Sequence, residues 1–187
     1  MAELTFSQSE RRSFLGPILI ALAVLAIAGA GIYFYMPHRV ADLAVTRTAI
    51  LPTHTEFKTD SRLVGAQTES QDDLYVLATV RIDDKLKLPL FLKDITATFS
   101  PADGDDITTS AVEKNDIPNL YVTFPALKSL ASPPLLRETA IAPGEHAEGM
   151  VLLHFPVTQA VWDQRKSATI TLDFYHQGPL TVTIPKP

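Results

Sequence analysis

Hydrophobic residues recur at every second position through most of the chain after its first forty residues, which is the period of a half-buried β-strand. The clearest such segments cover residues 74–82, 90–99 and 150–155, and weaker ones cover 43–51 and 107–112. Stretches rich in proline, glycine and aspartate separate them. About seven to nine short strands with turns of this kind predict an all-β fold, an antiparallel immunoglobulin-like β-sandwich.

The strongest local pattern lies at the end of the chain. Six large apolar residues alternate with threonine and aspartate on the two sides of a Gln-Gly-Pro turn: Ile170, Leu172, Phe174, Leu180, Val182 and Ile184. This pattern predicts a hairpin with one buried face. Pro185 then ends the pairing, because proline has no N–H to donate.

Two segments have the spacing of short helices. Residues 117–130 place apolar side chains three and four positions apart, but Pro125 disfavours one continuous helix. Residues 158–165 begin with Thr158, a good N-cap, and we expect Val161 and Trp162 to point inward.

A different pattern occupies residues 14–36, FLGPILIALAVLAIAGAGIYFYM, which contain no charged side chain. A helix of this length spans roughly 34 Å, enough to cross a hydrocarbon core of about 30 Å. Pro17 falls in the first turn, where its missing N–H costs little, and Tyr33, Phe34 and Tyr35 form an aromatic belt at the far end. The segment is therefore predicted to be a single transmembrane helix.

Basic residues next to this helix indicate its orientation. Arg11 and Arg12 precede it and Arg39 lies just past its far end, so the positive-inside rule favours an N-terminus in the cytoplasm. Two alternatives remain open: a signal peptide cleaved after the small residues at 26–28, and a twin-arginine export signal at 11–15. All three place the β domain outside the cytoplasm, in the periplasm.

The chain is accordingly divided into four parts: a short cytoplasmic tail at 1–13, the transmembrane helix at 14–36, a tether at 37–41 and one extracytoplasmic β-sandwich domain at 42–187. The net charge is −5, and no cluster of Lys and Arg is longer than Arg165-Lys166. This composition gives no support for nucleic-acid binding. The chain has no cysteine, which excludes disulfides, thiolate metal sites and a cysteine nucleophile.

Motifs that carry chemistry are scarce in this sequence. No Gly-x-Ser-x-Gly, Ser-x-x-Lys or glycine-rich phosphate loop occurs. The acidic run at 103–106 suits either a calcium loop or a solvated hairpin turn, and it lacks the spacing of an EF-hand. His146, His154 and His176 have no zinc-ligand spacing, and the alternation of its strand places His154 on the face opposite Val151. The prediction is that the domain is not an enzyme and holds no metal or cofactor.

The segment 117–136 is unusually apolar for a connection. Two interpretations stand side by side: it caps one open end of the sandwich, or it is an interaction surface for a protein or a lipid. The residues that would form this surface are Tyr121, Phe124, Leu127 and Leu130.

A resemblance is carried by residues 74–99, by Ile141-Ala142-Pro143-Gly144-Glu145 and by residues 148–157. A Pro-Gly-Glu turn followed by an apolar strand that ends at Phe-Pro-Val resembles membrane-anchored immunoglobulin-like domains of bacteria, some of them similar to late-embryogenesis-abundant type 2 (water-stress) domains. It covers about a third of the chain. Asp83-Asp84 stand where the water-stress domains usually have Asn-Pro. The resemblance implies a fold and no catalytic motif.

From these observations we expect a membrane-anchored, non-enzymatic module that acts by protein–protein interaction at the outer face of the inner membrane. Its partners would be the membrane and a protein of unknown identity. The alternative is a domain that binds a lipid or small amphiphile through segment 117–136. A hydrolase with an unrecognised site is a third hypothesis, and clustered titratable groups in a cleft would support it.

Overall fold

The computed structural model describes residues 15–35, 39–58 and 68–186. The chain forms two compact units, Met1–His38 and Arg39–Pro187, and each is described by itself. The predicted tail at 1–13 lies outside the described residues, as do Phe14 and Met36 at the ends of the predicted span.

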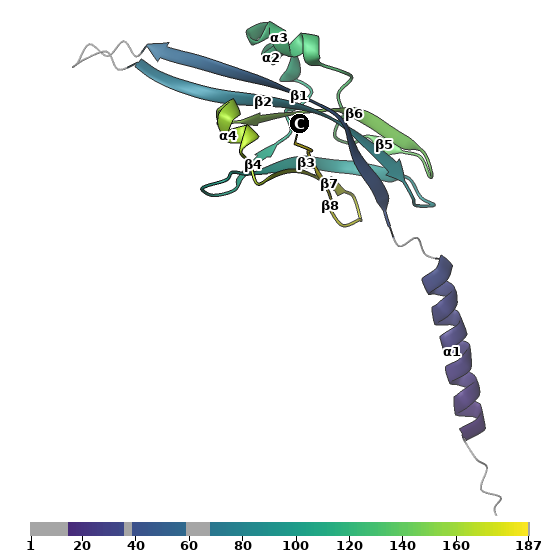
Figure 1. Ribbon diagram of the computed structural model, residues 1–187. Helices are drawn as coiled ribbons and strands as arrows, with labels where there is room; N and C mark the ends of the chain where they lie inside the picture. The colour runs from purple at the N-terminus through teal and green to yellow at the C-terminus, as the bar shows by residue number, and fades with distance from the viewer. Residues whose placement is uncertain (1–14, 36–38, 59–67, 187) are drawn as a thin grey trace, which may run out of the picture. The chain divides into compact units, whose positions relative to one another are not determined.

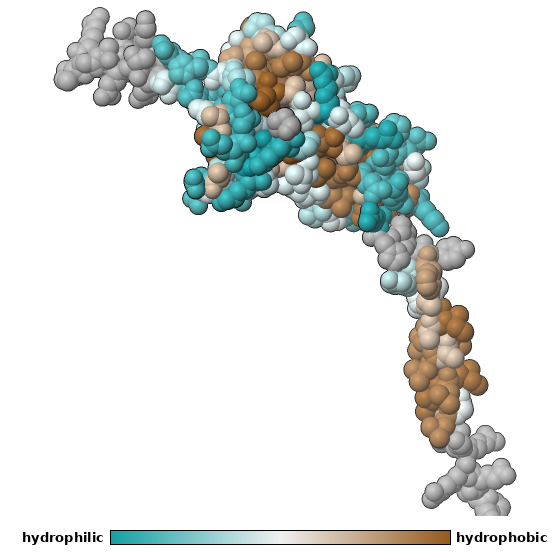
Figure 2. Space-filling view, in the orientation of Figure 1, coloured by the Kyte–Doolittle hydropathy of each residue, from teal (hydrophilic) through white to brown (hydrophobic). Residues whose placement is uncertain are grey.

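The first unit contains one helix, α1 (Leu15–Tyr35). Figure 2 shows it as an almost unbroken apolar surface. The stretch Leu15–Phe34 is long and apolar enough to cross a membrane, and its leucine and isoleucine side chains are exposed. The helix predicted over 14–36 is thus present throughout the described part of that range.

The second unit consists mostly of antiparallel strands in two sheets, with three short helices (Figure 1). One sheet has the order β1-β2-β6, formed by β1 (Ala41–Lys58), β2 (Thr68–Asp84) and β6 (His146–Phe155). Because β1 already begins at Ala41, that residue belongs to the sheet and is buried, although it was expected in the tether.

The other sheet has the order β4-β3-β7-β8, and a two-residue strand β5 also pairs with β3. Its strands are β3 (Leu90–Ser100), β4 (Ile107–Ser110), β5 (Ala140–Ile141), β7 (Ser167–Phe174) and β8 (Leu180–Thr183). The predicted C-terminal hairpin is confirmed, because Ile170 pairs with Val182 and Leu172 pairs with Leu180.

The main core lies between the two sheets. Alternate residues of both sheets meet there, such as Val76 and Leu153 from one and Ile95 and Ile170 from the other. An aromatic cluster fills one region, where Phe99 stacks on Trp162 at 5.5 Å between ring centroids and Phe155 lies 5.7 Å from Trp162. This core contains the apolar face that the alternating pattern predicted.

The outer face of the β1-β2-β6 sheet is also partly covered. Helices α2 (Ile117–Thr123) and α3 (Pro125–Leu130) lie on it (Figure 1). They form a second, smaller core with Tyr75 and Leu77 of β2 and Met150 and Leu152 of β6. The segment 117–136 therefore covers a sheet face, whereas one of the two interpretations placed it at an open end of the sandwich.

The two helices meet at Phe124-Pro125, as the helix-breaking effect of Pro125 predicted. The third short helix, α4 (Gln159–Asp163), follows its expected N-cap, since the Thr158 hydroxyl accepts a hydrogen bond from the Val161 N–H. Trp162 is buried as predicted. The prediction for Val161 was wrong, because its side chain is 40% exposed. Successive helical residues point about 100° apart, and here the direction that buries Trp162 leaves Val161 at the surface.

The two edges of the β1-β2-β6 sheet differ. Along β6, the Met150 N–H donates to Pro133 O, the Leu135 N–H donates to Met150 O, and the Val112 N–H donates to Leu152 O. Along β1, residues 45–50 form no backbone hydrogen bond outside the β1–β2 ladder in the part of the chain that the structure describes. One edge is therefore sealed by backbone hydrogen bonds, whereas the β1 edge is open in the sense that residues 45–50 have no such partner there, although β8 lies near β1.

Candidate functional site

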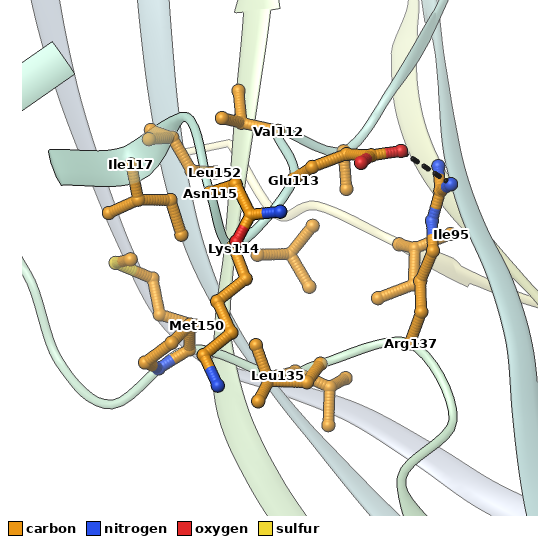
Figure 3. Close-up of a pocket in the computed structure, with 14 residues that line it drawn as sticks. Ile95, Val112, Glu113, Lys114, Asn115, Ile117, Leu135, Arg137, Met150 and Leu152 are labelled. Atoms are coloured by element: carbon orange, nitrogen blue, oxygen red, sulfur yellow. Dashed lines mark hydrogen bonds and ion pairs between the residues drawn. The ribbon is translucent and has the colours of Figure 1, made fainter. Parts of the chain in front are cut away.

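A pocket of about 300 Å³ lies where the connection from β4 to α2 and the segment 134–137 approach β6 (Figure 3). We call it the α2 pocket. Its walls are apolar side chains from four parts of the chain: Ile95, Val112, Ile117, Leu135, Met150 and Leu152. A hollow of this kind can shield a small apolar group from water.

Charged side chains stand at the rim of the α2 pocket. Arg137 is held by two ion pairs of 2.9 Å, one to Asp94 and one to Glu113, and Figure 3 shows the second at one side of the pocket. Lys114 also lines the pocket and forms no ion pair with a described residue. The pocket thus combines apolar walls with a rim of balanced charge, in which Arg137 and Lys114 stand with Asp94 and Glu113. Apolar walls with a polar rim suit a small amphiphile, whose charged group could pair with Lys114.

A second hollow, of about 210 Å³, runs along the open edge of β1. We call it the edge groove. On one side it is lined by β1, and on the other by the end of α4 and the residues after β8: Val45, Thr46, Arg47, Thr48, Ile50, Trp162, Asp163, Arg165, Pro185 and Lys186. Because successive strand residues point to opposite faces, a hollow lined by four consecutive residues of β1 must lie beside the strand's backbone edge.

Arg165 forms the most unusual contact of the edge groove. Its side chain is buried, and its guanidinium carbon lies 4.3 Å from the centre of the Trp162 ring. Nη1 donates to Trp162 O at 3.0 Å and Nη2 donates to Pro185 O at 2.8 Å, while Nε has no hydrogen-bond partner among the described residues. Burial lowers the pKa of this guanidinium from its usual range, and the charge of Asp163 partly opposes that shift.

The charges around the edge groove are unbalanced. Arg47, Arg165 and Lys186 line it against a single acidic residue, Asp163, in a chain whose net charge is −5. None of the three basic residues forms an ion pair with any residue in the described ranges. The groove therefore presents a positive field beside an unpaired strand edge, which suits an anionic occupant.

The predicted interaction residues of segment 117–136 are mostly used inside the domain. Leu127 is fully buried in the smaller core, and Tyr121, Phe124 and Leu130 are half-buried against it. Leu127 cannot touch a partner while the helices stay packed, so it is removed from the candidate surface. Val122 is the most exposed apolar residue of α2, at 82%.

The other residues singled out by sequence are placed far from one another. The acidic run 103–106 forms the exposed turn between β3 and β4, where Gly104 has a positive φ of 100°. His146 and His154 lie eight residues apart on β6, about 26 Å along an extended strand, and His176 lies in the turn between β7 and β8 of the other sheet. No group of three metal-ligand side chains comes together in the described ranges.

His154 does point to the outer face, as predicted, and it has a partner there. Its Nε2 lies 2.7 Å from Oδ1 of Asp73, and its ring packs 5.1 Å from that of Tyr75. Burial raises the pKa of Tyr75, with a smaller contribution from the charge of Asp73. The nearby Thr53 hydroxyl donates to the Asp73 backbone carbonyl at 3.2 Å, so this cluster ties β1, β2 and β6 together.

Sequence reasoning missed the charged residues that line the two hollows. Arg165 was assigned to the helical segment 158–165, and its spacing of three residues from Trp162 was the available signal for contact between them. Lys114, Arg47 and Lys186 carried no signal, because an isolated basic residue is ordinary on a surface. Their grouping depends on the fold.

Comparison with known proteins adds little to this geometry. No protein-family model matches the chain, and no curated protein matches it. Among solved structures, it is similar to a chain described as the X-ray structure of Northeast Structural Genomics Consortium target SoR45, with 7% sequence identity and a TM-score of 0.32. That match covers 74% of this chain and 82% of the other.

Proposed function

We propose that this protein is a single-pass membrane protein with a cytoplasmic N-terminus, whose immunoglobulin-like β-sandwich acts outside the cytoplasm as a non-enzymatic protein-interaction module. The observation that carries the proposal is the open edge of β1, an 18-residue strand that is hydrogen-bonded to a neighbouring strand on one side only within the described residues. Unpaired N–H and C=O groups along such an edge are a template for an added strand.

The connection between the two units favours contacts near the bilayer. Five residues separate Tyr35 at the end of α1 from Ala41 at the start of β1. Even fully extended they reach only about 20 Å. With α1 embedded, the strand with the open edge is also the strand tethered to the membrane, which favours a partner that is itself in or at the membrane.

The test is site-specific photo-crosslinking in native membranes with the full chain. A photo-reactive residue in place of Thr48, at the open edge, should crosslink to a discrete partner. The matched control replaces Lys128, an exposed residue of α3. Crosslinks from Lys128 and none from Thr48 would overturn the proposed edge and place the contact on the helices.

The α2 pocket supports a second candidate function, the binding of a small anionic amphiphile at one end of segment 117–136. Its apolar walls and the unpaired Lys114 favour this alternative. With the full chain in lipid nanodiscs, hexanoate should give a saturation-transfer NMR signal that Lys114→Glu weakens and Lys128→Glu does not. Equal signals from both variants would reject the pocket as the binding site.

A further inference from the structure

We propose that the edge groove binds an extended, acidic segment of a partner protein, which adds to β1 as an antiparallel or parallel strand. This inference rests on the proposed function and specifies the chemistry of the partner. Three independent features of the groove carry it: its position along a strand edge, its apolar floor and its excess of positive charge.

The position of the edge groove is given by the residues of β1 that line it. The groove is lined by the consecutive residues 45–48 and by Ile50, so it follows the backbone and not one face. A register shift between Val45 and Arg47 marks a β-bulge at Thr46. The Thr46 hydroxyl donates to Glu148 at 2.7 Å, across β2 on β6, so its side chain is directed away from the groove and leaves the backbone at the open edge.

The floor of the groove is apolar and rigid. Val45 and Ile50 of β1 pack against the main core, and Trp162 belongs to that core. Trp162 is held on Phe99 at an interplanar angle of 11°, with Arg165 also stacked on its ring. A bound strand would place alternate side chains toward this floor, as extended peptides do in strand addition.

The positive charge of the edge groove favours an acidic partner segment. Arg47 of β1 and Lys186 after β8 both line the groove, and the buried Arg165 adds a third positive charge, against the single carboxylate of Asp163. An extended segment that alternates acidic and apolar residues would direct carboxylates to the walls and apolar side chains to the floor. Such a segment supplies the missing negative charge without a separate counter-ion.

The experiment uses the full chain in lipid nanodiscs and a fluorescein-labelled hexapeptide of alternating glutamate and valine, amidated at its end. Fluorescence anisotropy should show saturable binding that weakens as salt is raised. The same peptide with lysine in place of glutamate should not bind. An analogue N-methylated at every residue keeps the charge and loses the N–H donors, so strand addition requires that its binding be lost.

Two charge reversals locate the site. Arg47→Glu and Lys186→Glu should each weaken binding of the acidic peptide by about tenfold, because each replaces an attraction by a repulsion at short range. Lys128→Glu makes the same charge change on α3 and should leave the affinity unchanged. Equal weakening by all three variants would show attraction to the whole molecule and overturn the assignment of the groove.

Binding of the N-methylated analogue with undiminished affinity would overturn strand addition, and no binding of the acidic peptide would overturn the groove proposal as a whole. Neither outcome alters the crosslinking result at Thr48, which tests the open edge with its natural partner. A crosslink at Thr48 together with a failed peptide test would therefore preserve the interaction edge and reject its acidic specificity.

Discussion

Side chains along β7 divide between the core and the opposite face of the sheet. Phe174 is buried in the main core, while the half-buried Thr171 faces the other way and its hydroxyl lies 3.1 Å from that of Thr181. Phe174→Ala should lower the free energy of unfolding by about 3–5 kcal/mol, because it leaves a cavity among residues that cannot fully close it. Thr171→Ala should cost less than about 1.5 kcal/mol. Urea unfolding of residues 39–187 measures both, and the reverse order would show that the two faces had been assigned wrongly.

His54 provides a pH-dependent contact between β1 and β2. Its Nδ1 lies 2.7 Å from Oδ1 of Asp72, and this hydrogen bond is the main cause that raises the pKa of His54 above its usual 6.5. A raised folded-state pKa means that the contact stabilises the strand pair fully below about pH 6.5 and that this contribution is lost as pH rises through the folded value.

We therefore expect Asp72→Asn to lower the pKa of His54 in an NMR titration of its ring protons. The matched control is Asp103→Asn in the exposed turn between β3 and β4, which should leave the His54 titration curve in place. A curve that does not move in Asp72→Asn would mean that the hydrogen bond does not persist in solution.

The buried face could be predicted where apolar and polar residues alternate strictly, as in β7, and no face was predicted for β2, where residues at both even and odd positions are apolar. In β2, Tyr75 and Leu77 are as apolar as Leu74 and Val76, and in β6 Met150 and Leu152 alternate with Val151 and Leu153. Such runs indicate a sheet covered on both faces. For β6, the face that carries Val151 was identified and lies in the main core, while the apolar outer face of both strands is explained only by α2 and α3.

At the scale of elements, the sealed edge of β6 requires the backbone at Leu135 to lie very close to Gly149 of β6. A side chain at Gly149 would place its Cβ 2.6 Å from the backbone nitrogen of Leu135. Gly149→Ala should therefore destabilise the domain by about 1–3 kcal/mol, because the segment that covers β6 must move. Gly178→Ala, with nothing within 4 Å of the added carbon, is the control. Urea unfolding of residues 39–187 compares them, and equal midpoints would show that the segment 133–135 is not held against β6.

The sequence predicted the extent of a strand only where apolar residues alternate along it. The strand expected at 74–82 extends from Thr68 to Asp84, and that expected at 43–51 extends from Ala41 to Lys58. Most of the additional residues are polar, and the strands continue there through backbone pairing, so the sequence shows little hydrophobic periodicity at these positions. By contrast, Pro125 fixed the division between α2 and α3, because proline affects the backbone directly.

For the whole molecule, the predicted topology is directly testable. A reporter that is active only outside the cytoplasm should be active when fused after Pro187, with the N-terminus retained on the mature protein. The physical reason is the pair Arg11-Arg12 next to an apolar helix. A soluble product that starts near Gly29 would show cleavage instead, and an inactive reporter would reverse the orientation.

The β domain should fold without its helix, since residues 39–187 form a compact unit with its own core. A fragment of these residues should be soluble and show a circular dichroism spectrum dominated by strand. A helical or unfolded spectrum would indicate that the domain needs the membrane or a partner. The candidate site could not be predicted at this scale, because it brings residues 45–50 together with residues 162–186.

The pairing of β1 with β2 continues beyond the end of β6. Residues 53–58 and 68–73 pair only with each other in the described part of the sheet, because β6 reaches β2 only from Leu74 onward (Figure 1). An isolated two-stranded ribbon is marginally stable in water, so this part should open far more often than the three-stranded region. Amide protons within the single strand β2 should thus fall into two kinetic classes in hydrogen exchange. Those before Leu74 should exchange through local fraying, and those after it only through opening of the core.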